Sequence, residues 1–192
     1  NALLLIAYTK AYQHTKRECF ADTAHRTARY ILRELTSEEG GCYCGQDADS
    51  DGVEGKYYVF TPEDVKTVLR ETEGTEFCPL YDVTDSGNFE GKSIPNRIHT
   101  SENGWDMKDP RLEKLYDFRL NRTKLHKDDK ILLSWNAWAV IALAKAGQAL
   151  EEPSYLDAAI RIHDFIESKM VTENDRLYLR YRDGEAAYVG QL

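Results

Sequence analysis

The acidic stretch 46–56 carries four carboxylates within eight positions, which is enough for acid–base or metal chemistry. The four are Asp47, Asp49, Asp51 and Glu54. Carboxylates held close together acquire different pKa values, so one can donate a proton while another accepts one. Cleavage of a glycosidic bond needs such a pair. The sequence therefore predicts Asp47, Asp49 and Glu54 as catalytic candidates, with Lys56 binding substrate or neutralising the cluster.

The same spacing also matches the first half of a calcium-binding loop. Asp47, Asp49 and Asp51 would direct their oxygens at one ion, and Gly52 would provide the turn. Tyr58 occupies the position at which such a loop places a bidentate glutamate, and both flanks have strand rather than helix patterns. A third interpretation is a solvated acidic turn whose side chains bond to the local backbone. We expect no metal or cofactor, with calcium at the three aspartates as the alternative.

A second group of candidates lies close to position 130. Asp129 could act as a further catalytic carboxylate. Trp135 offers a flat apolar surface on which a sugar ring could stack, and Asn136 can both donate and accept hydrogen bonds. Ser134 suits the N-cap position of a helix, which would place Trp135 and Asn136 at the exposed start of that helix. We predict that both residues bind substrate.

Two helical hairpins, over about 1–35 and 135–170, are expected to position these residues. They repeat at an offset of 135 positions, from Asn1 and Asn136 as far as Ile31 and Ile166, without a gap. The first helix of each hairpin is the more apolar and should be the inner one. The second helix keeps charged residues on one face and should be the outer one. Alternating inner and outer helices are typical of an α/α toroid.

The predicted fold class is mainly α: an incomplete α/α toroid of helical hairpins, forming one domain over 1–192. A β-hairpin and loop insertion is expected over about 40–108. Its strands, Cys42–Gly45 and Lys56–Phe60, would flank the acidic stretch and pair with each other. The chain would close with a strand over about 176–182 that has no partner.

Two further helices have clear start signals. Thr61 is followed by Pro62 and Asp64, which is the spacing of a capping box with proline at the first helical position. That helix should end near Gly74. Asp109-Pro110 opens the next helix, which is expected to continue to about Arg122.

The acidic stretch and Trp135 are expected at the same end of the toroid. The acidic stretch follows an outer helix, whereas Trp135 begins an inner one, and outer helices run antiparallel to inner ones. The glycine-containing stretch 87–92 could join this face, with Asn88 and Glu90 as additional substrate-binding residues. None of the five histidines falls into a recognisable catalytic arrangement.

Composition narrows the classes of partner. The formal charge of −8 disfavours nucleic-acid binding, which needs a basic face. No apolar run approaches the length of a membrane span. The four cysteines show neither a disulfide framework nor zinc spacing, so we expect reduced thiols in a cytoplasmic protein.

Four segments, in this order, resemble the signatures of a family of thioredoxin-domain-containing proteins. The segments are Gln46–Glu63, Gly87–Lys92, Asp128–Lys130 and Ser134–Asn136. The family includes the spermatogenesis-associated thioredoxin-like protein of animals and bacterial relatives, among which this chain would fall. Asp51 stands where the family usually has glutamate. The resemblance implies a thioredoxin-like domain followed by an (α/α)6 toroid similar to N-acylglucosamine 2-epimerases and six-hairpin glycosidases.

The resemblance further implies that the thioredoxin-like domain and the remaining hairpins are partners missing from this chain. We expect a carbohydrate-active domain, hydrolase- or epimerase-like, with a carbohydrate or small molecule as substrate and two carboxylates acting as acid and base. The epimerases of this fold use histidines, and none is placed for that here, which favours hydrolase-like chemistry or binding. The alternative is a non-catalytic interaction module that partners a thioredoxin-like domain.

Overall fold

The computed structural model describes residues 1–100 and 109–189, and the chain divides into two compact units. The helical unit comprises Asn1–Gln46 together with the chain from Lys127 onward. The insert unit comprises Asp47–His126. The described residues are mainly helical, with small antiparallel sheets, as predicted. That the whole chain acts as one domain stays a prediction, and the last part of the expected insertion, 101–108, lies outside the described residues.

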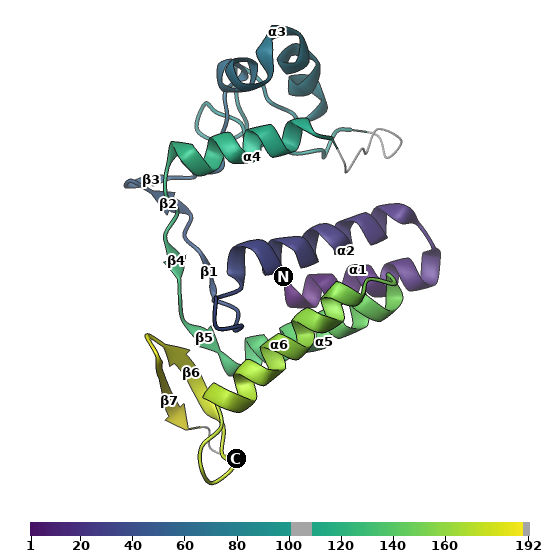
Figure 1. The fold of residues 1–192 in the computed structure, drawn as a ribbon. Helices are drawn as coiled ribbons and strands as arrows, with labels where there is room; N and C mark the ends of the chain where they lie inside the picture. The colour runs from purple at the N-terminus through teal and green to yellow at the C-terminus, as the bar shows by residue number, and fades with distance from the viewer. Residues whose placement is uncertain (101–108, 190–192) are drawn as a thin grey trace. The chain divides into compact units, whose positions relative to one another are not determined.

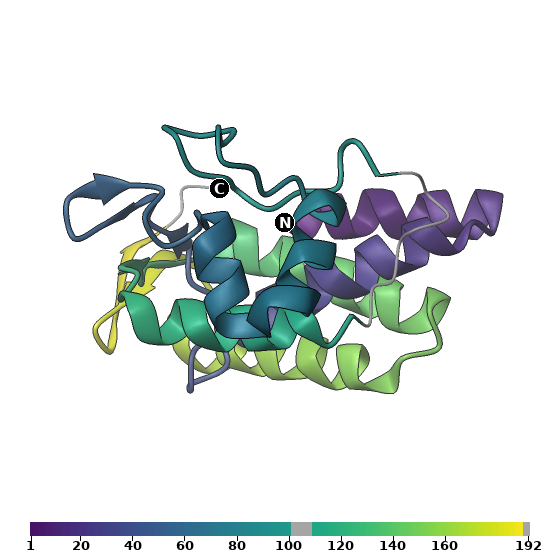
Figure 2. The same ribbon diagram turned by 90° about the horizontal axis from the view of Figure 1, so that it is seen from above.

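Four α-helices build the helical unit and confirm the two predicted hairpins. They are α1 (Ala2–Thr15), α2 (Glu18–Tyr30), α5 (Leu133–Ala149) and α6 (Pro153–Lys169). A π-helical turn, η1 (Ile31–Leu35), extends α2. Helix α1 packs on α2 and α5 on α6, while α1 and α5 also pack on each other. The axes of the four helices lie roughly parallel in both ribbon views, and the two helices of each hairpin run in opposite directions (Figure 1, Figure 2).

The two hairpins repeat in structure at the offset found in the sequence. The second helix begins at Glu18 in one hairpin and at Pro153 in the other, 135 positions later. Ala24 and Ala159, which are equivalent, are both buried in the core that the four helices share. Small residues at such positions let helices approach closely, whereas larger side chains such as Leu143 fill the remaining space.

The repeat extends into the turn that follows each hairpin. The Tyr43 N–H donates to the carbonyl of Leu35 at 2.8 Å, and the Tyr178 N–H donates to that of Met170 at 2.9 Å. An isolated antiparallel bridge between 36 and 42 is matched by one between 171 and 177. Each second helix therefore leads into the same backbone arrangement.

Short strands complete the helical unit. Strand β1 (Gly45–Gln46) pairs with β4 (Lys127–Asp128), and β5 (Ile131–Leu132) pairs with β6 (Tyr178–Arg182). Strand β7 (Glu185–Val189) pairs in turn with β6. The expectation that the strand near the end of the chain lacks a partner is therefore wrong, because a two-residue turn at Asp183-Gly184 returns the chain as β7.

The acidic stretch forms a tighter hairpin than predicted, and it belongs to the insert unit. Its strands are β2 (Asp49–Ser50) and β3 (Val53–Glu54). The predicted pairing of 42–45 with 56–60 is wrong: β1 pairs with β4, and Phe60 bridges to Ser93. The insert unit has its own core, in which residues of α3 (Pro62–Leu80) and α4 (Arg111–Arg122) pack together.

Helix α3 begins as the sequence predicts but ends later. The Thr61 hydroxyl accepts from the Asp64 N–H at 3.1 Å, and the Asp64 carboxylate accepts from the Thr61 N–H at 3.0 Å. The helix continues past Gly74 to Leu80, with a break at Arg70, whose φ is 68°. Buried Phe77, which lies in this later part, supplies the apolar contact that extends the helix.

Candidate functional site

A two-residue turn shapes the acidic hairpin. Asp51 and Gly52 both have positive φ values, 52° and 74°, as a type I′ turn requires. The turn places Asp49 directly opposite Glu54 on the two strands. Both side chains are exposed, so the hairpin presents two neighbouring carboxylates to solvent. Like charges at such a cross-strand pair repel each other, so the turn must hold them together.

The remaining carboxylates of the acidic stretch, those of Asp47 and Asp51, accept hydrogen bonds from neighbouring groups. Asp51 accepts hydrogen bonds from the Lys56 ammonium at 2.7 Å and from the Thr123 hydroxyl at 2.8 Å, which lowers the pKa of its carboxyl. Asp47 accepts from the Asp49 N–H at 3.1 Å. Lys56 therefore neutralises Asp51, one of the two roles expected for it.

Arg122 fixes the turn that follows the hairpin. Its guanidinium donates to the carbonyls of Lys56, Tyr57 and Val59 at 2.9, 3.2 and 2.7 Å. Three carbonyls that converge on one cation leave this segment little freedom, so Lys56 is presented on a rigid backbone.

The calcium arrangement is not assembled in the described residues. Asp51 turns its oxygen to Lys56 and Thr123, while Asp47 bonds to the local backbone. Within 1–100 and 109–189, a set of three ligand atoms close enough for one ion occurs only at His163, Asp164 and Glu167, which are exposed on α6. Calcium binding at the aspartates stays a prediction.

The loop that carries Asn88 and Glu90 belongs to the insert unit. The Asn88 amide bonds to the Asp82 carboxylate and to both backbone groups of Ile94, so its hydrogen bonds shape the loop. Glu90 is exposed. The ring of Phe89 packs against Gly55, where any side chain would collide with it. Two of the predicted segments, the acidic hairpin and this loop, are thus in direct contact.

Trp135 and Asn136 occupy very different environments at the start of α5. Trp135 is 55% exposed, as expected, and Trp138 one turn later is 47% exposed. Asn136 is fully buried, contrary to the expectation of an exposed helix mouth. Its amide accepts from the Cys42 N–H at 2.6 Å and donates to the carbonyls of Cys42 and Leu132 at 3.0 and 2.9 Å.

These bonds give Asn136 a structural task. It fastens the turn after the first hairpin to the start of the second. Ser134 is not the N-cap; Leu132 occupies that position, and the helix begins at Leu133. The extended backbone of β5 runs directly into α5, which explains why no side-chain cap is used. Asp129 forms an ion pair with Arg182 at 2.8 Å and is partly exposed.

A polar group that the sequence did not indicate lies where α2 ends. The Tyr30 hydroxyl donates to the Gln46 side-chain carbonyl at 3.0 Å, and the Gln46 amide donates to Glu34 at 3.3 Å. Glu34 also pairs with Arg33 at 2.7 Å and is only 6% exposed. The π-helical turn that contains Glu34 is the structural feature that points to a functional role for this polar group, since such turns recur at functional sites. Sequence periodicity does not reveal it.

The cysteines are free thiols, as predicted. Burial raises the pKa of Cys42 to about 11, so its thiol stays protonated at neutral pH. A protonated, buried thiol is a poor nucleophile, which gives Cys42 a packing role.

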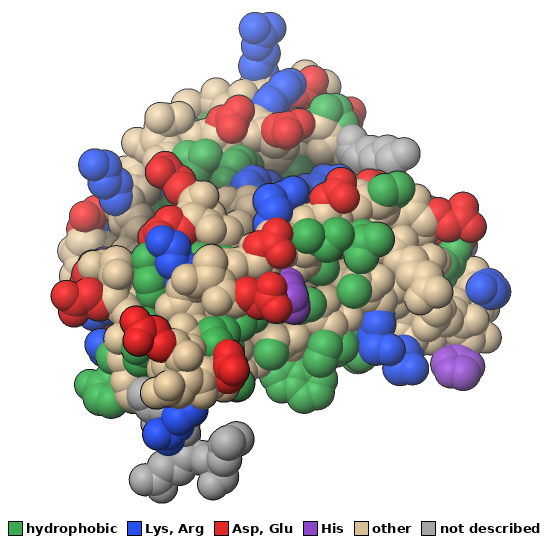
Figure 3. Space-filling model, turned by 60° about the horizontal axis from the view of Figure 1, so that its bottom comes forward, with side chains coloured by type: hydrophobic (Ala, Val, Ile, Leu, Met, Phe, Trp, Pro, Cys, Tyr) green, Lys and Arg blue, Asp and Glu red, His purple; other side chains and the backbone are tan. Residues whose placement is uncertain are grey.

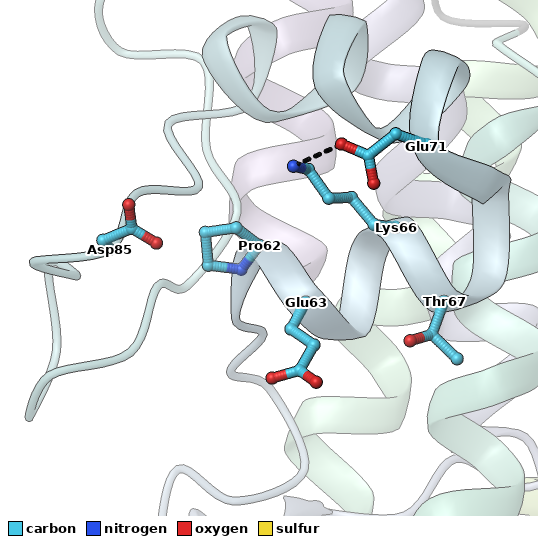
Figure 4. Close-up of a pocket in the computed structure, with 6 residues that line it drawn as sticks. All are labelled: Pro62, Glu63, Lys66, Thr67, Glu71 and Asp85. Carbon is cyan, nitrogen blue, oxygen red and sulfur yellow. Dashed lines mark hydrogen bonds and ion pairs between the residues drawn. The ribbon is translucent and has the colours of Figure 1, made fainter.

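The insert unit also has an open hollow of about 470 Å³ beside α3. Its lining residues are Pro62, Glu63, Lys66, Thr67, Glu71 and Asp85. Figure 4 shows Lys66 reaching to Glu71, with Asp85 on a separate loop. The Lys66 ammonium nitrogen and a carboxylate oxygen of Glu71 are 2.7 Å apart. None of the residues predicted from the sequence lines this hollow.

The predicted residues are thus distributed over both units. The insert unit holds Asp47, Asp49, Glu54 and Lys56 on one hairpin, with the loop of Asn88 and Glu90 packed against it. The helical unit holds Asp129, Trp135 and Asn136. The expectation that the two groups share one face joins residues of different units and stays a prediction.

The fold and these groups define a protein of repeated helical hairpins with an acidic β-hairpin in an insert. No family model matches the chain. Spermatogenesis-associated protein 20 of Homo sapiens is 29% identical over 206 residues, which cover 88% of this chain and 26% of the relative. The protein of the same name from Mus musculus is 31% identical, covering 78% and 24%. An uncharacterised protein of Caenorhabditis elegans is 26% identical, covering 91% and 28%.

These similarities extend over most of the chain and support a relation to the spermatogenesis-associated protein 20 family. The chain spans about a quarter of the length of the relatives it matches.

Proposed function

We propose that the chain is part of a carbohydrate-active protein and binds sugar at the start of α5. The observation that carries the proposal is the exposure of Trp135 and Trp138, which lie three residues apart and therefore on one face of the helix. Exposed tryptophans are costly unless they serve contact, and the indole face complements the apolar face of a pyranose ring.

The acidic hairpin of the insert unit is the part of the chain that we propose for catalysis. Asp49 and Glu54 are exposed cross-strand neighbours, so they present two carboxyl groups together. Such a pair can act as acid and base in hydrolysis of a glycosidic bond. Asp47 and Asp129 are assigned lesser parts, because each already bonds to a neighbour.

The larger assembly is also a proposal. The repeated hairpins would form part of an α/α toroid, completed by further hairpins and accompanied by a thioredoxin-like domain in a longer, cytoplasmic parent protein. The repeat of helices and turns supports stacking of further hairpins. In the described parts of the chain, each helix is too short or too polar to cross a bilayer.

The binding test uses the full chain with glucose, mannose, N-acetylglucosamine and cellobiose, by saturation-transfer NMR and tryptophan fluorescence. We expect Trp135→Ala to weaken binding of the preferred sugar about tenfold, since loss of a stacking contact costs on the order of 1 kcal/mol. Leu156→Ala is the control, because Leu156 is similarly exposed but lies on α6. The absence of signal with all four sugars would refute the proposal.

The catalytic part has its own test. If the acidic hairpin cleaves cellobiose, Asp49→Asn and Glu54→Gln should each abolish glucose release without changing the melting temperature. Glu63→Gln, an exposed change in the same unit, should leave the rate unaltered. Sugar binding without turnover in the wild type would reduce the proposal to a binding function.

A second candidate is the interaction module, favoured by a further observation. Leu3 and Leu4 on α1, and Trp138 and Ile141 on α5, are all at least 42% exposed on helices that pack together. Exposed hydrophobic side chains are visible among charged ones in the space-filling view (Figure 3). Another helical hairpin of a longer parent chain is the partner that the internal repeat supports.

Sedimentation and dye binding distinguish this candidate. If the α1–α5 face needs a covering helix, the isolated chain should bind anilinonaphthalene sulfonate and self-associate with increasing concentration. Leu3→Glu combined with Ile141→Glu should remove both properties. A wild-type chain that stays monomeric and binds no dye would contradict the interaction module.

A further inference from the structure

The two hairpins carry different side chains at three equivalent positions. Tyr30, Glu34 and Gln46 in the first correspond, at the offset of 135, to Phe165, Lys169 and Tyr181 in the second. The turns that follow the two hairpins are alike, since both contain the same bridge and the same hydrogen bond, but the first hairpin ends in the π-helical turn Ile31–Leu35, whereas α6 stays α-helical to Lys169. The second hairpin therefore shows which side chains can close this turn without a group of polar residues.

In the second hairpin, aromatic packing completes the turn. Phe165 and Tyr181 are 2% and 4% exposed, and their rings meet edge to face with centroids 5.1 Å apart. Lys169 reaches outward, 3.5 Å from Glu39. This arrangement stabilises the turn by burying apolar surface, without a buried charge.

In the first hairpin, hydrogen bonds occupy the same place. Gln46 bonds to both Tyr30 and Glu34, and Glu34 is buried. Burial of a carboxylate costs free energy, and the second hairpin avoids this cost because its equivalent residue, Lys169, is exposed. Because the apolar set closes the same turn in the second hairpin, the turn itself does not demand the polar set, which accompanies the π-helical end of the first hairpin.

The other buried carboxylate in the described residues has a complete structural explanation. Asp109 accepts from the Arg111 guanidinium at 2.8 to 3.1 Å and from the Tyr81 hydroxyl at 3.3 Å. Glu34 is likewise paired with an arginine, Arg33 at 2.7 Å, and in addition accepts from a neighbouring amide. A carboxylate that accepts from the NH₂ group leaves the amide only one favourable orientation.

The orientation of Gln46 has a chemical consequence. Glu34 engages one N–H of its amide, and Tyr30 engages one lone pair of its carbonyl. The amide also has a second N–H and its carbonyl a second lone pair, on a half-buried side chain. A donor next to an acceptor matches two neighbouring hydroxyl groups of a sugar, one accepting and one donating.

Gln46 lies at the same end of the helical unit as the start of α5. It follows Cys42 by four residues, and Cys42 is bonded to Asn136, the residue after Trp135. Strand β1, which contains Gln46, is held in place by its pairing with Lys127. The amide is thus fixed on the scaffold that also presents the exposed indole.

We propose that Gln46 is the hydrogen-bonding anchor for a pair of neighbouring hydroxyl groups on a neutral sugar, with Glu34 and Tyr30 as its positioning residues. The inference rests on the proposed sugar-binding function and names the specificity-determining residue of that site. Glu34 acts through Gln46 and has no direct part in contact with the sugar.

The test measures the affinity of the full chain for glucose, mannose, N-acetylglucosamine and cellobiose by titration calorimetry. Gln46→Ala should weaken the preferred sugar at least about tenfold, because two hydrogen bonds are lost. Tyr30→Phe, which introduces the residue of the second hairpin, should weaken it severalfold with only a small change in the urea midpoint. Glu34→Gln should have a similar effect, because a second amide no longer dictates the orientation of Gln46.

The control is Gln148→Ala, which removes an exposed glutamine from α5 in the same unit. It should leave affinity unchanged. Wild-type binding with undiminished affinity in Gln46→Ala would overturn this inference and leave the proposed function standing. No binding by the wild type would overturn both. If Glu34→Gln fails to fold, Tyr30→Phe decides: unchanged affinity there refutes the positioning role.

Discussion

The first and second helical hairpins reach the same backbone turn with different chemistry. In the second, Phe165 and Tyr181 fill the space beneath the turn. In the first, Tyr30, Glu34 and Gln46 fill it with hydrogen bonds. The chain also departs from the repeat after this point: the insert unit follows the first hairpin, whereas the short strand β7 follows the second.

The comparison separates the residues that both hairpins need for folding from the side chains that differ between them. A helical hairpin needs its small buried residues and the hydrogen bond that closes the turn, and both copies have them. The side chains beneath the turn are polar where the helix ends in a π-helical turn and apolar where it stays α-helical. The polar residues of the first hairpin therefore accompany a backbone feature that recurs at functional sites.

The largest expected effect comes from removing the aromatic packing of the second hairpin. Phe165→Ala should lower the free energy of unfolding by about 3–5 kcal/mol, because a buried phenylalanine leaves a cavity. Tyr30→Ala, at the equivalent and half-buried position, should cost less than half of that. Urea denaturation monitored by circular dichroism measures both. Equal losses would mean that the two turns are stabilised alike.

The link between the hairpins should have the next largest effect. Asn136→Ala removes three hydrogen bonds and leaves the buried N–H and carbonyl of Cys42, and the half-buried carbonyl of Leu132, without their side-chain partner. We expect a loss of about 2–3 kcal/mol in the same assay. Asn121→Ala, an exposed change on α4, should remain within about 0.5 kcal/mol of the wild type. A small effect at Asn136 would show that the repeats stack without this bond.

Acid should lower the stability of the insert unit, which follows the first hairpin and has no counterpart after the second. Hydrogen bonds from Arg111 lower the pKa of Asp109 below its ordinary value of 3.8. A lowered pKa stabilises the folded state above that ordinary value, and the contribution disappears as the pH falls through the folded-state pKa. Thermal melts between neutral pH and pH below 3.8 should therefore show a steeper acid loss in the wild type than in Asp109→Asn. Parallel curves would contradict this role.

The smallest effect on stability should come from Tyr30→Phe, which makes the first hairpin resemble the second at one position. The change removes a single half-buried hydroxyl, so the free energy of unfolding should shift by about 1 kcal/mol or less. Chemical denaturation with a matched Tyr12→Phe control measures it, since Tyr12 is a half-buried tyrosine of α1. A loss as large as that of Phe165→Ala would make the hydroxyl a structural requirement.

Sequence periodicity predicts the helices because they obey local rules. The four helices of the hairpins, their repeat and the capping box at Thr61 all follow from residue spacing. The Asp51-Gly52 turn was also readable, since Asp-Gly is a strong signal for a two-residue hairpin. The prediction instead placed these residues in the acidic loop of a wider hairpin, between Cys42–Gly45 and Lys56–Phe60, and so missed the tight hairpin.

Other features depend on contacts that spacing does not contain. Asn136 is predicted at an exposed helix start by its neighbours, yet it is buried because Cys42, 94 positions earlier, supplies its partners. The break at Arg70 and the π-helical turn at Glu34 likewise arise where tertiary packing overrides helix propensity. The candidate residues of the acidic stretch were identified, but the polar group around Gln46 required the structure.

The bond between Cys42 and Asn136 also bears on the order of events during synthesis. A contact across 94 positions closes a long loop, and its entropy must be offset before the contact stabilises anything. As the chain leaves the ribosome, the first hairpin therefore emerges without the hydrogen bonds between Cys42 and Asn136. These bonds stay absent while the insert is being made. The insert unit has its own core and can fold during this delay. Asn136 then bonds to Cys42 late in folding, once the second hairpin begins to form.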